Sequence, residues 1–310
     1  MENYKNILVV IDPTTNDQIA LKRAIELAKK NQSKLTAFLS IFDFSYEMTT
    51  ILSSGEREIM RQSVIDDRLA WVNEIVAEHN AEKLPIQCVV EWHNRPFEAI
   101  INQVIDNKFD MVIKGTHQHD KFKAVIFTPT DWHVLRKCPC PVLLVKSHTW
   151  PEKGNILAAV NIGSDEEEHL SLNKIITEEA NNLASLIGAN VHLVNSFPGT
   201  PVNIAIEIPE FDAQEYNETM LKTHKQAMAK HAKLFNINEE RTYVREGLAE
   251  DIIDEVATEI DAELVILGTI GRTGFSAAII GNTAEHVIDQ LKCDVLALKP
   301  VGYISPLAPH

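Results

Sequence analysis

The chain has 310 residues, 24% of them charged, and a formal net charge of -15. This acidity argues against a nucleic-acid-binding surface, because neutralising phosphates requires clustered Lys and Arg. The start, MENYKN, does not resemble a signal peptide and no apolar run is as long as a membrane span, so we expect a cytoplasmic protein with neither nucleic-acid nor membrane partners.

The first half of the chain alternates strand and helix patterns. Apolar runs predict five strands, and apolar residues at helical spacing predict the helices between them. In chain order these are a strand at 7–11, a helix at about 17–31, a strand at 34–42, a helix at about 56–80, a strand at 86–92, a helix at 96–107, a strand at 111–114, a helix near 131–136 and a strand at 142–145. Strands separated by helices predict a doubly wound parallel sheet with helices on both faces.

The second half repeats the first. Asn6–Asp12 is matched 149 residues later by Asn155–Asn161, and Val142–Lys146 is matched 153 residues later by Val295–Lys299. So small a drift indicates two copies of one domain, and the period is too long for a solenoid. Strands of the second copy are expected near 155–160, 190–196, 241–245, 264–267 and 295–298. We therefore predict an α/β chain of two tandem domains, 1–147 and 154–310, joined by a linker at 148–153.

A glycine-rich stretch follows the fourth strand of the second copy. Gly268 and Gly271 come after the apolar run Leu264–Leu267, and Gly281 precedes a helical pattern that starts at Ala284. Glycines at the carboxyl end of a strand let backbone amides approach a phosphate, and the next helix directs its free N–H groups at the same anion. The spacing is neither the dinucleotide nor the P-loop fingerprint. On the glycines alone, a phosphate site and a tight turn are equal alternatives.

Taken together, these residues resemble the universal stress protein family, in its tandem two-domain form, over essentially the whole chain. The resemblance rests on the spacing Gly-x2-Gly-x9-Gly, on Val9–Asp12 at the end of the first strand and on Cys138–Val145 near the end of the first domain. It implies an adenine nucleotide alpha hydrolase-like fold with strand order 3-2-1-4-5 in each domain. It also implies a cytoplasmic stress-response protein that contributes to survival under stress such as DNA damage, and ATP binding in one branch of the family.

The resemblance places a nucleotide site in each copy, and the two differ in completeness. The site of the second copy comprises Asn161, Ser196, Gly268, Gly271, Gly281, Asn282 and Thr283. Asn161 stands where the family has Asp, and Asn282 replaces the family's Ser or Thr, so we expect an altered site for ATP, ADP or another small phosphate ligand. The degenerate site of the first copy comprises Asp12, Gly115, Gln118 and Thr128. There Gln118 takes space that a phosphate needs and Pro129 removes an amide donor, so the ligand is expected in the second domain.

Two further features leave alternatives open. His117, His119 and Asp120 offer ligands for a transition metal, but alternate loop residues need not converge, so a solvated polar loop is the other interpretation. Segments 43–52 and 197–206 are loop-like and apolar. They either line a pocket for an apolar or amphipathic small molecule or pack between the domains.

Three classes of function fit the sequence. The leading one is a regulatory protein of the stress response that binds an adenine nucleotide. The others are a slow ATPase and an interaction scaffold that has lost nucleotide binding. No lysine of the P-loop type is present, and Asn161 replaces the expected carboxylate, so we expect a binding protein rather than an enzyme.

The last strand of each copy also predicts how the domains assemble. Val142–Val145 and Val295–Leu298 are apolar and would leave an exposed edge on an isolated domain. Domains of this family pair through that strand, so we predict an internal pseudo-dimer, with a homodimer as a further option. Small-angle X-ray scattering should show one compact particle, and two lobes at variable spacing would contradict the prediction.

Overall fold

The computed structural model describes residues 4–47, 52–81, 83–118, 125–146, 149–164, 166–200, 212–269 and 282–309. It divides into two compact units, one of residues 1–147 with 304–310 and the other of residues 148–303. The predicted second domain, 154–310, differs from the second unit at its end, because residues 304–310 group with the first unit. Within the described ranges, no helix is both long and apolar enough to span a bilayer.

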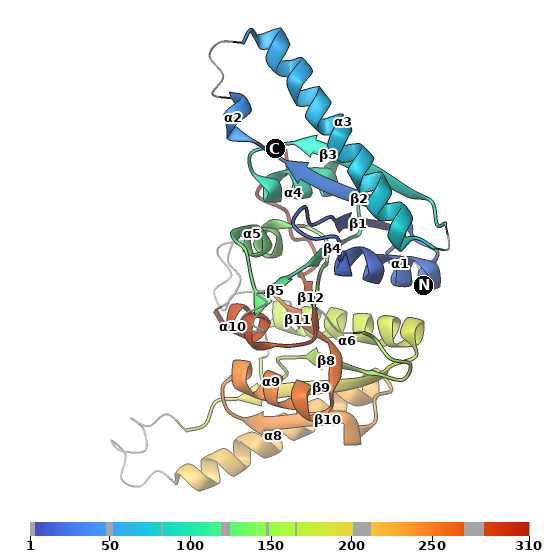
Figure 1. The fold of residues 1–310 in the computed structure, drawn as a ribbon. Coiled ribbons are helices and arrows are strands. Elements are labelled where there is room, and N and C mark those ends of the chain that lie inside the picture. Colours follow the sequence, from blue (N-terminus) through green and yellow to red (C-terminus); the bar gives the residue numbers. More distant parts are fainter. Residues whose placement is uncertain are drawn as a thin grey trace. The chain divides into compact units, whose positions relative to one another are not determined.

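The first unit has its five main strands in one parallel sheet (Figure 1). The strand order is β3-β2-β1-β4-β7, which is the predicted 3-2-1-4-5 arrangement. In chain order the elements are β1 (Asn6–Val10), α1 (Ile19–Asn31), β2 (Lys34–Ile41), α2 (Phe44–Glu47), α3 (Ser54–His79), β3 (Ile86–Trp92), α4 (Pro96–Asn107), β4 (Met111–Gly115), β5 (His117–Gln118), β6 (Val125–Ile126), α5 (Pro129–Lys137) and β7 (Val142–Val145).

The second unit repeats this arrangement. Its strand order is β10-β9-β8-β11-β12, again parallel and again 3-2-1-4-5 along the chain. The elements are β8 (Asn155–Ala159), α6 (Glu167–Ile187), β9 (Asn190–Phe197), α8 (Ala213–Leu234), the short 3-10 helix η1 (Glu239–Arg241), β10 (Thr242–Glu246), α9 (Ala249–Glu259), β11 (Ala262–Gly268), α10 (Asn282–Gln290) and β12 (Asp294–Leu298).

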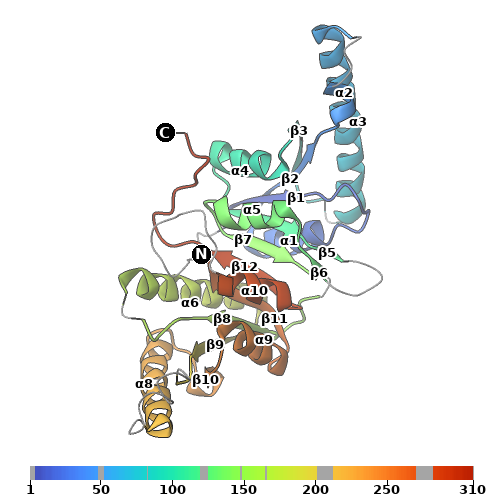
Figure 2. The same cartoon turned by 90° about the vertical axis from the view of Figure 1, so that its left-hand side faces the viewer.

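Both faces of each sheet are covered by helices, as Figure 2 shows for α1 and α3 against α4 and α5 in the first unit. The central strands are therefore buried on both sides; β4 and β11, for example, are buried at every residue except the last. In each unit the first and fourth strands are neighbours. The chain continues toward one edge of the sheet after the first strand and toward the other edge after the fourth. Open α/β sheets bind their ligands at the carboxyl ends of strands at this point. In each unit, the loops that follow the first and fourth strands (β1 and β4, β8 and β11) therefore lie where such a ligand would bind.

Two local elements differ from the sequence prediction. The prediction of a loop across 43–52 is wrong for residues 44–47, because these residues form α2. The Asp43 carboxylate accepts hydrogen bonds from N (2.9 Å) and Oγ (2.6 Å) of Ser45, which starts that turn, and the hydroxyl bond lowers the pKa of Asp43. A two-stranded antiparallel ladder, β5 with β6, also follows β4 in the first unit and was not predicted.

Candidate functional site

In the first unit, the loop after β1 is held by its own side chains. Gln18 clamps the main chain of Asp12 from both sides, since its Oε1 accepts from Asp12 N (2.9 Å) and its Nε2 donates to Asp12 O (2.7 Å). The Asp12 carboxylate accepts hydrogen bonds from N (2.8 Å) and Oγ1 (2.6 Å) of Thr14. The carboxylate that the family resemblance assigns to a nucleotide is therefore engaged within its own loop.

Helix α5, which follows the loop of the degenerate site, has a carboxylate of the chain itself at its N-terminus. Thr128 is the N-cap of α5, and the Asp131 carboxylate accepts from N (2.6 Å) and Oγ1 (2.8 Å) of Thr128 in a capping box. Asp131 is completely buried, and its other oxygen lies 2.6 Å from Nζ of the buried Lys114 at the end of β4. A negative charge is stabilising at a helix N-terminus. In this unit the chain supplies that charge itself, and the Thr128 hydroxyl is used in the same cap.

The second unit lacks this ion pair. At the equivalent positions, 153 residues later, Leu267 replaces Lys114 and Ala284 replaces Asp131. Leu267 is buried at the end of β11, and Ala284 lies in the first turn of α10. Asn282 and Thr283 are the first two residues of α10. The start of α10 therefore has no carboxylate at the position that Asp131 fills in the first unit.

Gly268, at the end of β11, has a packing role that is visible in the structure. A Cβ at this position would overlap Cδ2 of Leu172, a buried residue of α6. The equivalent Gly115 is less constrained, because its Cβ would lie 3.2 Å from Ile19 Cγ1. A side chain at position 268 would therefore require Leu172 to move. Gly271 and Gly281 lie outside the described residues, as do His119 and Asp120.

The loop that follows β8, residues 161–163, is held by three buried side chains from three elements. Asn173 of α6 accepts from Asn161 N (2.8 Å) and donates to Asn161 O (2.8 Å), as Gln18 does for Asp12. Asn195 of β9 accepts from Ile162 N through Oδ1 (3.2 Å), and its Nδ2 lies 3.0 Å from Nδ1 of His224 on α8. The side chain of Asn161 itself is exposed, and Ser196 is half-buried next to Asn195 on β9.

These three residues were not predicted from the sequence, and neither was the pair formed by Lys114 and Asp131. A signal for Asn195 is present, because it is a polar residue inside the apolar strand β9. For Lys114 and Asp131 the signal is the comparison of the two copies, because these charged residues of the first copy are replaced by apolar residues at the equivalent positions of the second. For Asn173 and His224 the helical pattern alone gives no signal, since each is one polar residue among many on its helix.

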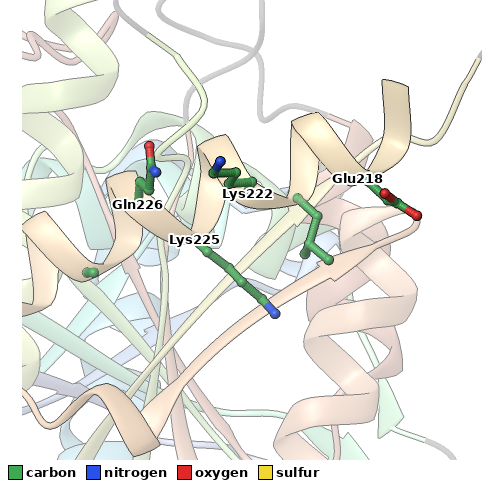
Figure 3. Close-up of a pocket in the computed structure, with 6 residues that line it drawn as sticks. Glu218, Lys222, Lys225 and Gln226 are labelled. Atoms are coloured by element: carbon green, nitrogen blue, oxygen red, sulfur yellow. The ribbon is translucent and has the colours of Figure 1, made fainter. Parts of the chain in front are cut away.

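An open groove of about 410 Å³ runs along α8, and none of its lining residues is a predicted site residue (Figure 3). It is lined by Glu218, Leu221, Lys222, Lys225, Gln226 and Ala229. These residues are spaced at helical intervals, so the groove follows one face of the helix. The figure shows Lys225 extending away from α8.

Of the three predicted metal residues, His119 and Asp120 lie outside the described residues. Among the described residues, no group of three or more His, Cys, Asp or Glu side chains is placed to hold a metal ion. His117 is known only through its backbone, as part of β5. A metal site at His117, His119 and Asp120 stays a prediction.

Two tandem five-stranded domains with this strand order define a duplicated α/β protein of the stress-protein type. The model of the universal stress protein family matches residues 3–146 and 154–299, so the chain belongs to this family. It is 52% identical to Universal stress protein E of Escherichia coli (strain K12), over 99% of this chain and 98% of that protein. It is 46% identical to Universal stress protein E of Photorhabdus laumondii, over 99% of this chain and 98% of the relative.

Solved structures agree with this assignment. A protein of unknown function from Pseudomonas aeruginosa PAO1 superposes with a TM-score of 0.74 at 30% identity, covering 96% of this chain and 93% of that one. A universal stress protein from Archaeoglobus fulgidus gives a TM-score of 0.64 over 96% of this chain and 98% of its own. At 14% identity the second comparison supports the fold alone.

Proposed function

We propose that the protein is a cytoplasmic regulatory member of the stress response that contributes to survival under stress such as DNA damage. We further propose that it binds ATP, ADP or a related phosphate ligand at the carboxyl edge of β8 and β11 in the second unit. The observation that carries the second proposal is the difference between the two units where their last helices begin.

In the first unit, the N-terminus of α5 is already satisfied by the carboxylate of Asp131, whose charge is balanced by Lys114. A phosphate arriving there would find the N–H and the hydroxyl of Thr128 already bonded to this carboxylate. The second unit has Leu267 and Ala284 at these positions, so position 284 supplies no such carboxylate to the start of α10. The N–H groups of a helix start and the adjacent glycines are well suited to an external anion.

The role of Asn161 favours a binding protein over an enzyme. An amide in place of the family's carboxylate keeps a hydrogen-bonding group but removes a charged ligand for Mg²⁺. Phosphoryl transfer depends on metal ions that neutralise the developing charge. We therefore propose ligand occupancy, rather than turnover, as the signal that the protein transmits.

The test of the site is a pair of matched variants measured by isothermal titration with ATP and ADP. Gly271→Val adds a β-branched side chain where the phosphate is proposed to sit, and we expect binding to weaken by at least about 100-fold, because both room and backbone conformation are lost. Gln118→Val changes the equivalent position of the first copy and should leave the affinity unchanged. Unchanged affinity in the Gly271 variant would reject the site.

The alternatives give different outcomes in companion measurements. A slow ATPase would turn over excess ATP in a metal-dependent manner and lose this activity when one acidic residue is replaced. A scaffold that has lost nucleotide binding would show no binding in the titration, and a native mass spectrum of the purified protein would show no nucleotide. For the proposed binding protein we expect turnover far below about 1 per second, the lower end of the kinase range.

A further inference from the structure

The pair formed by Asn195 and His224 exists in only one of the two units. The register of β8 with β9 and of β1 with β2 makes Leu39 the counterpart of Asn195. Leu39 is apolar and buried, so β2 offers no polar side chain at the position of Asn195; the loop after β1 is contacted instead by His79 of α3, whose Nε2 lies 2.9 Å from Asn16 O. Two sets of side-chain hydrogen bonds thus hold the loop after β8, one from Asn173 and one from Asn195, which is paired with His224. In the loop after β1, the hydrogen bonds of Gln18 correspond to those of Asn173. The extra hold lies in the unit for which a ligand is proposed.

The hydrogen bonds fix the protonation state of His224. Because Oδ1 of Asn195 accepts from Ile162 N, its Nδ2 must face His224 and donate to Nδ1. Nδ1 is then an acceptor, and the ring is neutral with its proton on Nε2. Turning the amide of Asn195 around would set its NH2 group against the N–H of Ile162, so the opposite assignment is excluded.

The imidazole is also fixed by packing. It stacks on Phe197 with ring centroids 5.0 Å apart and an interplanar angle of 26°. On its other side it occupies the space next to Gly163, where a Cβ would overlap Cε1 of the ring. His224 and Asn195 are both buried. The ring therefore supports residues 162 and 163 directly by contact and indirectly through Asn195.

We propose that His224 is a positioning residue: its neutral ring holds Ile162 and Gly163 at the carboxyl edge of β8, and protonation of the ring releases them. A proton on Nδ1 turns that atom into a donor that faces the donor Nδ2 of Asn195. If the Asn195 amide turns to accept from the charged ring, its NH2 group faces Ile162 N–H instead. In either orientation two hydrogen-bond donors face each other, so the hydrogen-bonded arrangement that holds Ile162 is lost.

The surroundings favour the neutral ring at pH 7. Burial lowers the pKa of His224 below its ordinary value of 6.5. The residues shown in contact with the ring, Asn195 and Phe197 of β9 and Gly163 of the loop, carry no charge. Burial lowers the pKa of His231 as well. The switch therefore operates below pH 6.5.

Amide hydrogen exchange of the full chain, resolved by NMR between pH 7.5 and 5, tests this role without any ligand. After correction for the intrinsic rate, we expect the protection of the Ile162 amide to fall about tenfold as the His224 ring titrates. The Asn161 amide is the internal control, because it donates to Asn173, which does not titrate. If Ile162 keeps its protection while the His224 ring signals shift, the proposal is overturned.

Three variants sharpen the test. His224→Asn places an amide oxygen where Nδ1 lies, so the protection of Ile162 should become independent of pH. His231→Gln removes the other buried histidine of α8 and should preserve the pH dependence, whereas its loss in this variant would reassign the switch to His231. Asn195→Leu reproduces Leu39 of the first unit and should abolish the protection of Ile162 at every pH. A His224→Asn variant that still shows the tenfold fall would overturn the proposal.

The consequence for the ligand rests on the proposed function. With ATP or ADP as the probe, we expect affinity to weaken with the same midpoint as the exchange of Ile162 in the unmodified chain, and the His224→Asn variant should lose that dependence. Absence of nucleotide binding would reject the proposed function, while the exchange experiment alone would still decide the role of His224.

Discussion

Replacing Asp131 with alanine should lower the free energy of unfolding of the first unit by about 3–5 kcal/mol, because it leaves the buried ammonium of Lys114 without its counter-charge. The variant also loses the capping box at the start of α5. Urea unfolding followed by tryptophan fluorescence measures the effect, since three of the four tryptophans, Trp71, Trp92 and Trp132, lie in the first unit.

The control uses residues that the chain already has at the equivalent positions. The double variant Lys114→Leu with Asp131→Ala reproduces Leu267 and Ala284 of the second unit. Apolar replacement of a whole buried ion pair is often neutral, so most of the lost stability should return. A loss below about 1 kcal/mol in the single Asp131 variant would show that the pair is not the buried charge pair described above.

Acidification from pH 6.5 to 4 should destabilise the second unit, with His192 making the largest single contribution. Burial, with a smaller effect from Arg241, lowers the pKa of His192 to about 4. The unfolded chain therefore takes up a proton near pH 6.5 that the folded chain refuses until about pH 4. The contribution of the neutral His192 ring to stability is fully present above pH 6.5 and is lost as the pH falls from there to about 4. Because the ring is only half-buried, solvent screening reduces the effect to roughly 1–2 kcal/mol.

Comparison with a His192→Gln variant at each pH isolates this contribution. Two carboxylates, the buried Glu263 and the half-buried Asp110 of the first unit, act in the opposite direction, because desolvation raises the pKa of each and so favours folding as the pH falls. Their contribution is the same in both proteins and cancels in the difference. Equal pH profiles for the unmodified chain and the variant would contradict the assignment to His192.

The fold could be predicted wherever an apolar run was bounded by clear breakers. Val142–Val145 was predicted at its true bounds, because Pro141 and Lys146 close the run on either side. For β11 the predicted start at 264 is two residues late. The cause is Glu263, a charged residue that pattern reasoning excludes from a buried strand. In the structure its carboxylate accepts from Asn155 N, a partner 108 residues away that no local pattern contains.

The candidate site was less predictable, because its decisive contacts join distant parts of the chain. Comparison of the two copies drew attention to the loops after the first and fourth strands, where Asp12, Asn161 and Gly268 lie. It could not show that Gly268 makes room for Leu172, or that Asp131 supplies the negative charge at the start of α5. Both depend on packing between elements that are far apart in sequence. The position of Gln118 in β5 could not be predicted either, because it depends on pairing with Val125.

The carboxylate of Asp131 also turns the first unit into a built-in blank for ligand screening. Any small anion that is added to the chain encounters two homologous helix starts in the same molecule and the same buffer, one of them permanently filled. NMR signals from around Thr128 should then report only bulk changes in salt, pH and viscosity. Subtracting their drift from the signals near Ala284 would leave the response of the second unit, without a separate reference protein.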